Sequence, residues 1–405
     1  MFVFMRMHTP RIAIVGAGPA GLIAALAARK LGLDAIVFEK APDFSRLSGA
    51  TLLQSSGLRA LDALGILDLC RPILRTTDAL RVEQPDGRTL VQLSYRGLDV
   101  PQPCAAVTLR RDLREYLLSA CEWADVPVMF GRRCTGVSSD AAGASVYFAD
   151  GGEIECDAVL ACDGVHSRVC ERGGLRGAFS APGLAYLRGV AERASADSTV
   201  REICDRRGRR IVIYPLPGER TAFMCSAPVG EWRRIVATQL EFWIDSWRTH
   251  GAEVVALLEA TLAWDRVSYH EVHEVRLRRW SRGRIFALGD AAHAVRPQLD
   301  CGASAAMVDA LTLLQLLAPA LHGCGSLDAA ARHYERLRRP FVTRAQRVAR
   351  RLDVAGWSAI QRALRPMLPL SRRERRLLAG YQRREARYFC LADDRQAPRA
   401  DPPVK

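Results

Sequence analysis

The sequence predicts an α/β protein, and three short motifs that occur in a fixed order along the chain carry this prediction. They are VGAGPAG at 15–21, CDGVHSRV at 162–169 and ALGDAAHAVRP at 287–297. Each motif follows a short apolar run that is typical of a buried parallel strand, and the first opens into an Ala-rich helical pattern. This order predicts a Rossmann-like domain that binds a dinucleotide.

The first motif has the sequence context that a dinucleotide-binding turn requires. It follows a predicted strand, Arg11–Val15, and it begins the predicted helix Pro19–Leu31. Gly16 permits a tight turn, Gly18 lets the backbone approach a pyrophosphate, and Gly21 lets the helix pack closely on the strand. The phosphates would then contact the free amides at the helix N-terminus.

A carboxylate follows the second predicted strand, Ala35–Phe38. Glu39 is spaced to accept hydrogen bonds from a ribose 2′-hydroxyl, and an acid there disfavours a 2′-phosphate. The site therefore suits FAD or NAD rather than NADP. Lys40, the next residue, is also a candidate cofactor contact.

The three motifs resemble those of the class A flavoprotein monooxygenases, the para-hydroxybenzoate hydroxylase-like family. The resemblance extends over most of the chain. The resemblance implies bound FAD, NADPH or NADH as a transient reductant, and O2 as co-substrate. It implies that a C4a-hydroperoxide of the flavin hydroxylates an aromatic or quinolone-like small molecule. The absence of a second GxGxxG motif fits a reductant that binds without a Rossmann domain of its own.

The resemblance also implies cofactor contacts in the second and third motifs. Asp163 and Gly164, after the predicted strand Ala158–Ala161, would lie near FAD and near the path of the reductant. Asp290, which follows Gly289 and the predicted strand 285–288, would accept a hydrogen bond from the ribityl chain. The alternatives are a turn residue at 163 and a helix N-cap at 290.

Two arginines resemble further cofactor contacts of the family. Arg46, in an Arg-x-x-Gly sequence, would lie near the pyrophosphate, and Arg110 would contact the cofactor from a helix. Each could instead be an ordinary surface arginine. His293, in the third motif, is expected to be structural.

The residues after the third motif would face the flavin ring. Pro297 would flank its reactive face, and the start of the next helix would face its pyrimidine edge through Gly302, Ala303 and Ser304. Asp300 stands where the family has glycine. A carboxylate aimed at the reduced flavin would oppose its negative charge, so Asp300 is expected to turn away and cap the helix that begins near Gly302.

Between the motifs the pattern changes to strands that predict an inserted, mostly antiparallel β-sheet substrate domain. Residues 79–95 contain a Pro-Asp-Gly turn and predict a hairpin. The longer insertion contains three strand-like runs and then a helical stretch: Ala185–Ala191, Arg210–Tyr214, Thr221–Ser226 and Glu231–His250. The candidate substrate contacts are Arg188, Tyr186 and Tyr214. The catalytic candidates are Arg188, Tyr214 and Pro297, and no residue stands out as a general base.

The FAD-binding domain is therefore predicted to be discontinuous, and C-terminal helices follow it. Its segments are 1–78, 96–172 and 276–325. The substrate domain comprises 79–95 and 173–275, a helical segment covers 326–392, and a polar tail covers 393–405.

Charge and cysteine content bear on the cellular setting. The chain of 405 residues carries a net charge of +14, and its segment 332–388 holds 17 arginines and four acidic residues. This basic segment suggests closing helices or peripheral contact with an anionic membrane, whereas no recognisable fold or pattern indicates nucleic acid. The 12 cysteines form no CxxC pair and no metal-ligand cluster, which favours a reducing cytoplasm. Cys70, Cys121, Cys156 and Cys162 lie in apolar contexts and are expected to be small core residues. No stretch is apolar enough to predict a transmembrane helix.

Three other functions share the expected fold. A flavin-dependent halogenase is disfavoured, because its Trp-x-Trp-x-Ile-Pro run is missing and no lysine occurs between 41 and 404. An FAD-dependent reductase or dehydrogenase of a lipid-like substrate would consume reductant without incorporating oxygen. A non-catalytic flavoprotein would bind a reactive intermediate. The substrate, the choice of NADH or NADPH and the oligomeric state stay open.

Overall fold

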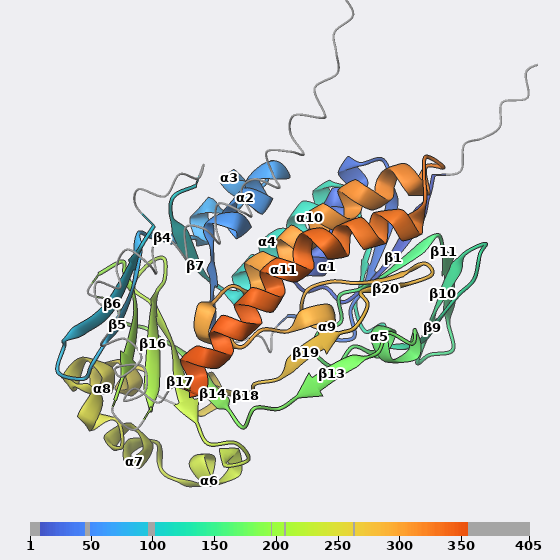
Figure 1. The fold of residues 1–405 in the computed structure, drawn as a ribbon. Helices are drawn as coiled ribbons and strands as arrows, with labels where there is room; N and C mark the ends of the chain where they lie inside the picture. Colours follow the sequence, from blue (N-terminus) through green and yellow to red (C-terminus); the bar gives the residue numbers. More distant parts are fainter. Residues whose placement is uncertain are drawn as a thin grey trace, which may run out of the picture.

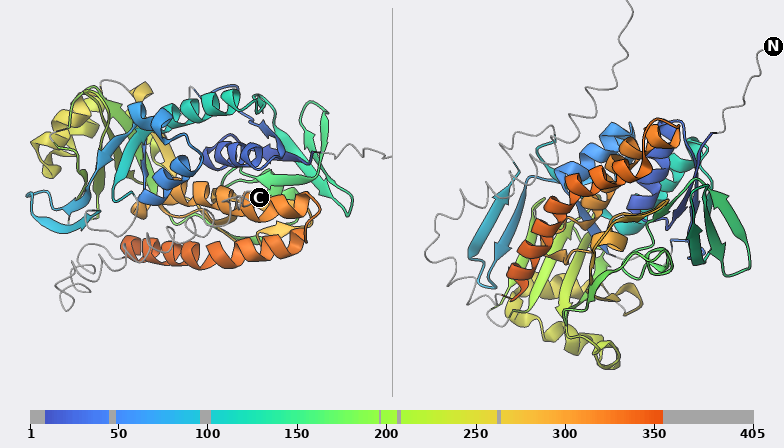
Figure 2. Two further views of the ribbon diagram at one scale, coloured as in Figure 1. Left: turned by 90° about the horizontal axis from the view of Figure 1, so that it is seen from above. Right: turned by 45° about the vertical axis from the view of Figure 1, so that its right-hand side comes forward.

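The protein is an α/β structure of mixed sheets and helices, described here by a computed structural model (Figure 1). The described residues are 9–44, 49–95, 102–195, 197–205, 208–261 and 264–354. A seven-stranded sheet and three short helices occupy one end of the molecule, and a small antiparallel sheet occupies the other end. The long helices α10 (Gly302–Leu321) and α11 (Leu327–Val354) lie side by side between them (Figure 2).

The first large sheet has six strands in the order β20-β21-β12-β1-β2-β8. All neighbours are parallel except β20, which is antiparallel to β21. The strands are β1 (Arg11–Val15), β2 (Asp34–Phe38), β8 (Val128–Met129), β12 (Ala158–Ala161), β20 (Ser281–Arg282) and β21 (Ile285–Ala287). The predicted strands at 11–15 and 158–161 are confirmed with the same bounds, and those at 35–38 and 285–288 differ by one residue at one end.

The second large sheet has seven strands in the order β18-β14-β17-β16-β15-β5-β6. Its neighbours are antiparallel, apart from the parallel pair of β15 and β5. The strands are β5 (Ala79–Glu83), β6 (Thr89–Ser94), β14 (Ala185–Ala191), β15 (Val200–Cys204), β16 (Arg210–Pro215), β17 (Thr221–Ala227) and β18 (Ser268–Glu271). The predicted hairpin at 79–95 is confirmed as β5 and β6, and it joins the three predicted strands of the insertion in one sheet.

The helical stretch predicted for 231–250 is broken in the structure. It forms α6 (Trp232–Ala237), α7 (Leu240–Asp245) and a 3-10 turn η2 (Arg248–His250). Thr238 and Gln239 have extended backbone between α6 and α7, with ψ of 138° and 141°. The break lets Ile244 and Trp247 pack against the outer face of the seven-stranded sheet, so tertiary packing overrides the local helical pattern.

The remaining elements connect and cover these two sheets. The smaller sheets pair β3 (Ala50–Leu53), β7 (Ala105–Leu109) and β4 (Arg75–Thr77); β9 (Cys134–Ser139), β10 (Ala144–Phe148) and β11 (Glu153–Cys156); and β13 (Gly177–Ser180) with β19 (Glu274–Leu277). The other helices are α1 (Pro19–Lys30), α2 (Ser55–Ala63), α3 (Leu67–Cys70), α4 (Arg110–Trp123), α5 (Arg168–Arg172), α8 (Ala252–Glu259), α9 (Asp290–His293), α10 (Gly302–Leu321) and α11 (Leu327–Val354), with 3-10 turns η1 (Arg71–Ile73), η3 (Trp264–Arg266) and η4 (Pro297–Leu299).

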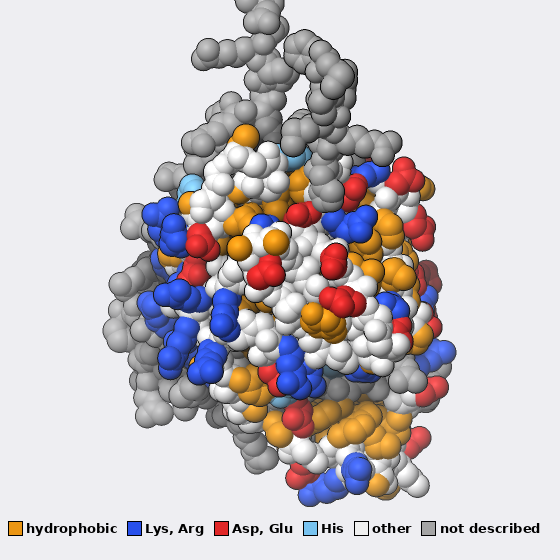
Figure 3. Space-filling view, turned by 90° about the vertical axis from the view of Figure 1, so that its right-hand side faces the viewer, with side chains coloured by type: hydrophobic (Ala, Val, Ile, Leu, Met, Phe, Trp, Pro, Cys, Tyr) orange, Lys and Arg blue, Asp and Glu red, His pale blue; other side chains and the backbone are white. Residues whose placement is uncertain are grey.

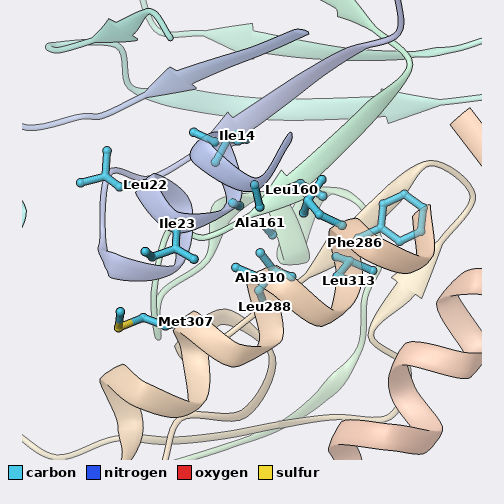
Figure 4. Packing of buried hydrophobic residues seen from close by; sticks show 14 of the residues in the cluster. Ile14, Leu22, Ile23, Leu160, Ala161, Phe286, Leu288, Met307, Ala310 and Leu313 are labelled. Atoms are coloured by element: carbon cyan, nitrogen blue, oxygen red, sulfur yellow. The ribbon is translucent and has the colours of Figure 1, made fainter. Parts of the chain in front are cut away.

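The main core lies between the six-stranded sheet and helices α1 and α10. Figure 4 shows Ile14 and Leu160 from the sheet, Leu22 and Ile23 from α1, and Met307 from α10 in one cluster. Helix α10 is apolar enough by length and hydropathy to cross a membrane, but 72% of its most apolar window is buried inside the protein. It is therefore the central core helix, as expected for a helix that is apolar on all sides.

Free thiols contribute to this core, in agreement with the cysteine prediction. Eleven cysteines fall within the described residues and none of these forms a disulfide. Burial raises the pKa of Cys70 to about 11 and that of Cys121 to about 12. Such thiols stay protonated and pack as small apolar groups.

A buried ionic cluster joins α9, α10 and α11. The Asp309 carboxylate of α10 accepts hydrogen bonds from Arg338 Nε at 2.7 Å and pairs with His293 Nε2 at 2.6 Å. The side chains of Asp309 and Arg338 have no exposed area. Burial alone would raise the pKa of Asp309, but His293 and Arg338 hold it below its ordinary value. Gly289, which precedes the motif aspartate, also donates its amide to Asp309 at 3.3 Å.

Replacing Arg338 by methionine should destabilise the protein by about 3–5 kcal/mol, because the buried Asp309 charge would lose one of its two side-chain partners. Arg336→Ala, an exposed arginine of the same helix, is the matched control and should change stability by less than about 0.5 kcal/mol. Denaturant unfolding measures both variants. Equal stability of the two variants would show that the cluster does not hold the helices together.

Candidate active site

The motif residues converge on a cavity of about 230 Å³ between the two large sheets. Its wall draws on the turn before α1, the end of β12, helix α4, strands β14, β16 and β17, and the segment that links α9 to α10. The predicted site residues on this wall are Gly18, Arg110, Gly164, Arg188, Tyr214, Asp290, Pro297, Gly302 and Ala303. The fold therefore brings together residues that are up to 285 positions apart in the chain.

The glycines of the first motif answer to different constraints. Gly16 has a φ of +106°, and a Cβ there would lie 2.4 Å from the carbonyl oxygen of Cys162. A Cβ on Gly21 would lie 1.9 Å from the carbonyl oxygen of Gly16. Gly18 differs, because its nearest protein atom would be 3.6 Å away and the residue faces the cavity. Gly16 and Gly21 are required by the turn itself, whereas Gly18 leaves space in which a ligand can approach the backbone.

Glu39 closes the same turn. Its carboxylate oxygens accept hydrogen bonds from the amides of Ala17 and Ala41, both at 2.9 Å. Each oxygen keeps a second lone pair, so the contact with a ribose hydroxyl stays a prediction. Lys40 is exposed and does not belong to the cavity wall.

Asp163 and Gly164 of the middle motif have different surroundings in the structure. Asp163 accepts hydrogen bonds from the Ser167 hydroxyl at 2.5 Å and from the Val169 amide at 3.1 Å. Burial raises the pKa of this carboxyl, while these hydrogen bonds lower it. Asp163 thus shapes the loop before α5, as the turn alternative expects, and its contact with a cofactor stays a prediction. Gly164, with a φ of +82°, faces the cavity.

Asp290 presents a carboxylate to the cavity. It is the first residue of α9, whose N-cap is Gly289, and its side chain makes no capping hydrogen bond. The residue is exposed where it lines the cavity. Desolvation by the surrounding protein raises the pKa of its carboxyl, while His293, Arg110 and Arg188 lower it. No hydrogen bond to Asp290 occurs within the described part of the chain. A ligand in the cavity therefore meets an acceptor that the fold itself has not used.

Four arginines line the cavity. Arg296 pairs with Glu274, and the other three have no ion-pair partner among the described residues. They are Arg110 and Arg114 of α4 and Arg188 of β14. Burial and the neighbouring charges of Arg188 and Arg114 lower the pKa of Arg110 to about 9, and burial also lowers the pKa of Arg188 and of Arg114. All three remain cationic at neutral pH, so the cavity is built to receive anionic groups.

The sequence analysis missed Arg114, although its position carried a usable signal. It lies four residues after Arg110, and residues at this spacing share one face of a helix. Arg46 lies outside the described residues. Gly49, the last residue of its motif, is described, and a Cβ there would lie 3.1 Å from the Cβ of Arg188. Gly49 therefore packs against the Arg188 side chain.

The expectation for Asp300 is wrong. The residue ends the 3-10 turn η4 in a left-handed conformation, and the N-cap of α10 is Cys301, without a side-chain capping bond. The carboxylate of Asp300 instead faces the seven-stranded sheet, where it accepts a hydrogen bond from the Tyr214 hydroxyl at 3.0 Å. Asp300 does not cap α10, because its left-handed backbone directs the side chain toward β16 rather than along α10.

The loop around Asp300 is tied to its neighbours by hydrogen bonds. Ser304 is buried and accepts one from the amide of Gln54 at 2.9 Å, so its contact with a cofactor stays a prediction. Gln54 also donates to the carbonyl of Leu299 at 3.2 Å, and Gln298 donates to the Tyr186 hydroxyl at 3.1 Å. Gln54 was not predicted from the sequence, because its partners Ser304 and Leu299 lie 250 and 245 residues away and its third partner, Tyr95, lies 41 residues away. His293 is structural, as expected, since it pairs with Asp309.

Comparison with known proteins bears on this site. A family model described as "FAD binding domain" matches residues 9–349. The 3-amino-4-hydroxybenzoate 2-monooxygenase of Streptomyces cremeus is 31% identical over 84% of this chain and 86% of its own. The 2-heptyl-3-hydroxy-4(1H)-quinolone synthase of Mycobacteroides abscessus is 28% identical over 86% of this chain and 92% of its own.

Solved structures show the same fold. PqsL of Pseudomonas aeruginosa in complex with 2-aminobenzoylacetate has a TM-score of 0.76 at 24% identity, over 92% of this chain and 99% of its own. HpxO of Klebsiella pneumoniae in complex with FAD has a TM-score of 0.71 at 23% identity, over 95% and 98%. These matches do not favour a reductase or a non-catalytic flavoprotein. The chain belongs to the FAD binding domain family and, within it, to the class A FAD-dependent aromatic monooxygenases.

Proposed function

We propose that this monooxygenase hydroxylates an aromatic acid, and that Arg188 binds the carboxylate of this substrate. The observation that carries the proposal is the Arg188 guanidinium, which faces the cavity from the substrate sheet without an ion-pair partner among the described residues. Relatives with names such as 3-amino-4-hydroxybenzoate 2-monooxygenase and 6-hydroxynicotinate 3-monooxygenase support an acid as substrate.

The residues present fit FAD. Gly18 and the free N-terminus of α1 would receive the pyrophosphate, and Arg114 lies beside Gly18 to neutralise it. Asp290 would accept a hydrogen bond from the ribityl chain. Pro297, Gly302 and Ala303 line the cavity where the ring would lie. When bound and reduced by NADPH or NADH, FAD supplies the group that activates O2.

In this proposal the six-stranded sheet with its helices is a Rossmann-like FAD-binding domain, and the seven-stranded sheet is the inserted substrate domain. Apolar residues on the inner face of the seven-stranded sheet, such as Val212 and Met224, would exclude water from the aromatic ring. Arg188 and Tyr214 on the same sheet would orient the ring. The FAD-binding domain would comprise 1–78, 96–172 and 276–325, and the substrate domain would comprise 79–95 and 173–275.

A cytoplasmic location is part of the same proposal and is supported by the free thiols. Peripheral membrane contact through the basic C-terminal segment is also kept, although residues 355–405 lie outside the described part. A groove lined by exposed arginines, including Arg279, Arg332 and Arg336, runs along α11 and supports it. Figure 3 shows arginine and lysine side chains gathered on one flank of the molecule. Such a surface attracts anionic lipid headgroups.

The function is tested by mixing the reduced FAD-loaded enzyme with O2 and a panel of aromatic acids. The panel comprises 3-amino-4-hydroxybenzoate, 6-hydroxynicotinate and 2-aminobenzoylacetate, and 2-heptyl-4-quinolone serves as a neutral comparison. At least one acid should yield a product heavier by one oxygen atom, measured by mass spectrometry. Hydroxylation of the quinolone alone would contradict an acidic substrate.

Replacing Arg188 by methionine should raise the KM for the preferred acid about 10- to 100-fold, because a charge-assisted hydrogen bond contributes about 1.5–3 kcal/mol. The matched control is the carboxamide of the same compound, which offers no carboxylate to the guanidinium. The ratio of KM values for acid and amide should therefore shift in the variant. If the KM rises equally for the acid and the carboxamide, Arg188 shapes the pocket but does not bind the carboxylate.

Replacing Asp290 by alanine should weaken FAD retention about 10-fold or more, because the cavity loses its unused acceptor. The measurement is the ratio of flavin to protein absorbance after dialysis. Asp328→Ala, which removes an exposed carboxylate of α11, is the control and should keep the flavin. Full flavin content in Asp290→Ala would refute the assigned contact.

A further inference from the structure

No general base stands out in the sequence, and the structure offers a half-buried carboxylate for that task. Both carboxylate oxygens of Asp300 accept from the Tyr214 hydroxyl, at 3.1 and 3.0 Å. No arginine forms an ion pair with Asp300 among the described residues. Asp300 and Tyr214 both line the cavity, together with Arg188.

The backbone at Asp300 is held in an unfavourable conformation. Its φ is +44°, and only one other non-glycine residue among those described, Asp125, has a positive φ. A left-handed conformation costs an L-residue roughly 1–2 kcal/mol, and glycine would adopt it freely. A carboxylate is therefore kept at a position where the backbone favours glycine, and such strain in a cavity wall points to a task for the side chain.

The hydrogen bond also fixes what Tyr214 offers to a ligand. A tyrosine hydroxyl has one proton, and Tyr214 donates that proton to Asp300. Toward the cavity its oxygen can then act only as an acceptor. A ligand beside Tyr214 must donate a hydrogen bond from an O–H or N–H group.

We propose that Tyr214 and Asp300 together accept a proton from the aromatic substrate, an inference that rests on the proposed function. The O–H or N–H bond of the ring substituent breaks and its proton passes to the Tyr214 oxygen, while the Tyr214 proton passes to the Asp300 carboxylate. The electron pair stays on the substituent and enriches the ring carbon that is hydroxylated. After oxygen transfer, the proton returns from Asp300 through Tyr214 to the product.

The electrostatic surroundings suit this exchange. Burial raises the pKa of Asp300 to about 7, the hydrogen bond from Tyr214 opposes that rise, Glu202 adds to it and Arg188 lowers it. The Asp300 carboxylate also interacts electrostatically with the Tyr95 hydroxyl. Burial keeps the pKa of Tyr214 well above its ordinary value, so the tyrosine stays protonated and only relays. A base whose pKa lies near the working pH exchanges protons most effectively.

The pair narrows the class of substrate. Arg188 favours a carboxylate, and Tyr214 requires a hydroxyl or amino group on the ring. The enzyme should therefore act on hydroxy- or amino-substituted aromatic acids and reject aromatic acids that lack such a donor.

The test compares wild type with Asp300→Asn on the panel member that the wild-type enzyme hydroxylates. Asparagine tolerates a left-handed backbone and can still accept from Tyr214, so the variant removes the base and little else. Wild-type oxygen transfer should rise with pH through one ionisation near 7 and then level off. The variant should be about 100-fold slower at pH 7 and should recover only at higher pH, where the free substrate ionises.

Tyr214→Phe, which interrupts the relay, should show the same loss. The matched control is a second tyrosine–carboxylate pair in the same sheet, Tyr269 with Glu271 at 3.0 Å, which lies at the surface. Tyr269→Phe and Glu271→Gln should keep the wild-type rate and pH profile. All variants should bind FAD as the wild type does.

The outcomes separate the two proposals. If no panel acid gains oxygen with wild type, the proposed function fails and this inference fails with it. If wild type hydroxylates an acid and Asp300→Asn matches it in rate and pH profile, the function stands and the proton-accepting pair is refuted.

A stability measurement gives a readout that is independent of turnover. The folded carboxyl of Asp300 binds its proton more tightly than the unfolded one, because its pKa is raised from 3.8 to about 7. The wild-type enzyme should therefore lose stability relative to Asp300→Asn as the pH rises from 4 to 7, and the difference should be constant above that range. A difference that does not change with pH would show that Asp300 does not titrate there, and this would overturn the proposal.

Discussion

The Asp309 cluster is the interaction on which the position of the site depends. One carboxylate at the centre of α10 binds Arg338 of α11, His293 of α9 and the amide of Gly289. Gly289 is the residue before Asp290, so the cluster sets where the Asp290 carboxylate enters the cavity. A buried charge is stable only when its partners are in place, and this requirement makes the three helices and the motif turn interdependent.

The cavity itself shows the opposite electrostatic pattern. Arg110, Arg114 and Arg188 carry positive charge without ion-pair partners among the described residues, and Asp290 is an acceptor without a donor there. Partial burial of these arginines is unfavourable in the absence of a ligand, because each loses hydration and gains no ion pair among the described residues in return. These groups gather between the two large sheets of the described structure. A bound dinucleotide and an aromatic acid would supply the missing phosphate, hydroxyl and carboxylate groups.

Asp300 lies at the boundary between these two patterns. Its loop is fixed by hydrogen bonds from Gln54 to Leu299 and Ser304, and from Gln298 to Tyr186. This rigid attachment holds a left-handed backbone that aspartate alone would not favour. The carboxylate is thereby kept beside Tyr214, although helix α10 starts two residues later. The second large sheet thus provides both a cation and a proton acceptor to the same cavity.

Local sequence was sufficient for the parts of the structure that depend on short-range chemistry. The turn at Gly16, Gly18 and Gly21, its flanking strand and helix, and the hairpin at 79–95 were all predicted, because turn geometry and apolar periodicity are encoded within a few residues. The resemblance of three motifs was enough to indicate the cofactor and the reaction class. The core role of the cysteines and of His293 was also expected.

Other features were decided by contacts between distant segments. The stretch 231–250 is locally helical, yet packing against the sheet breaks it at Thr238 and Gln239. Asp300 was expected to cap a helix, because a capping interaction is local, but its partner Tyr214 lies 86 residues away. The unpaired state of Arg188 and the joining of α9, α10 and α11 at Asp309 also depend on groups that no sequence window contains. Short-range patterns determined the elements and the cofactor turn, and only the tertiary structure decided which charges are buried, paired or left for a ligand.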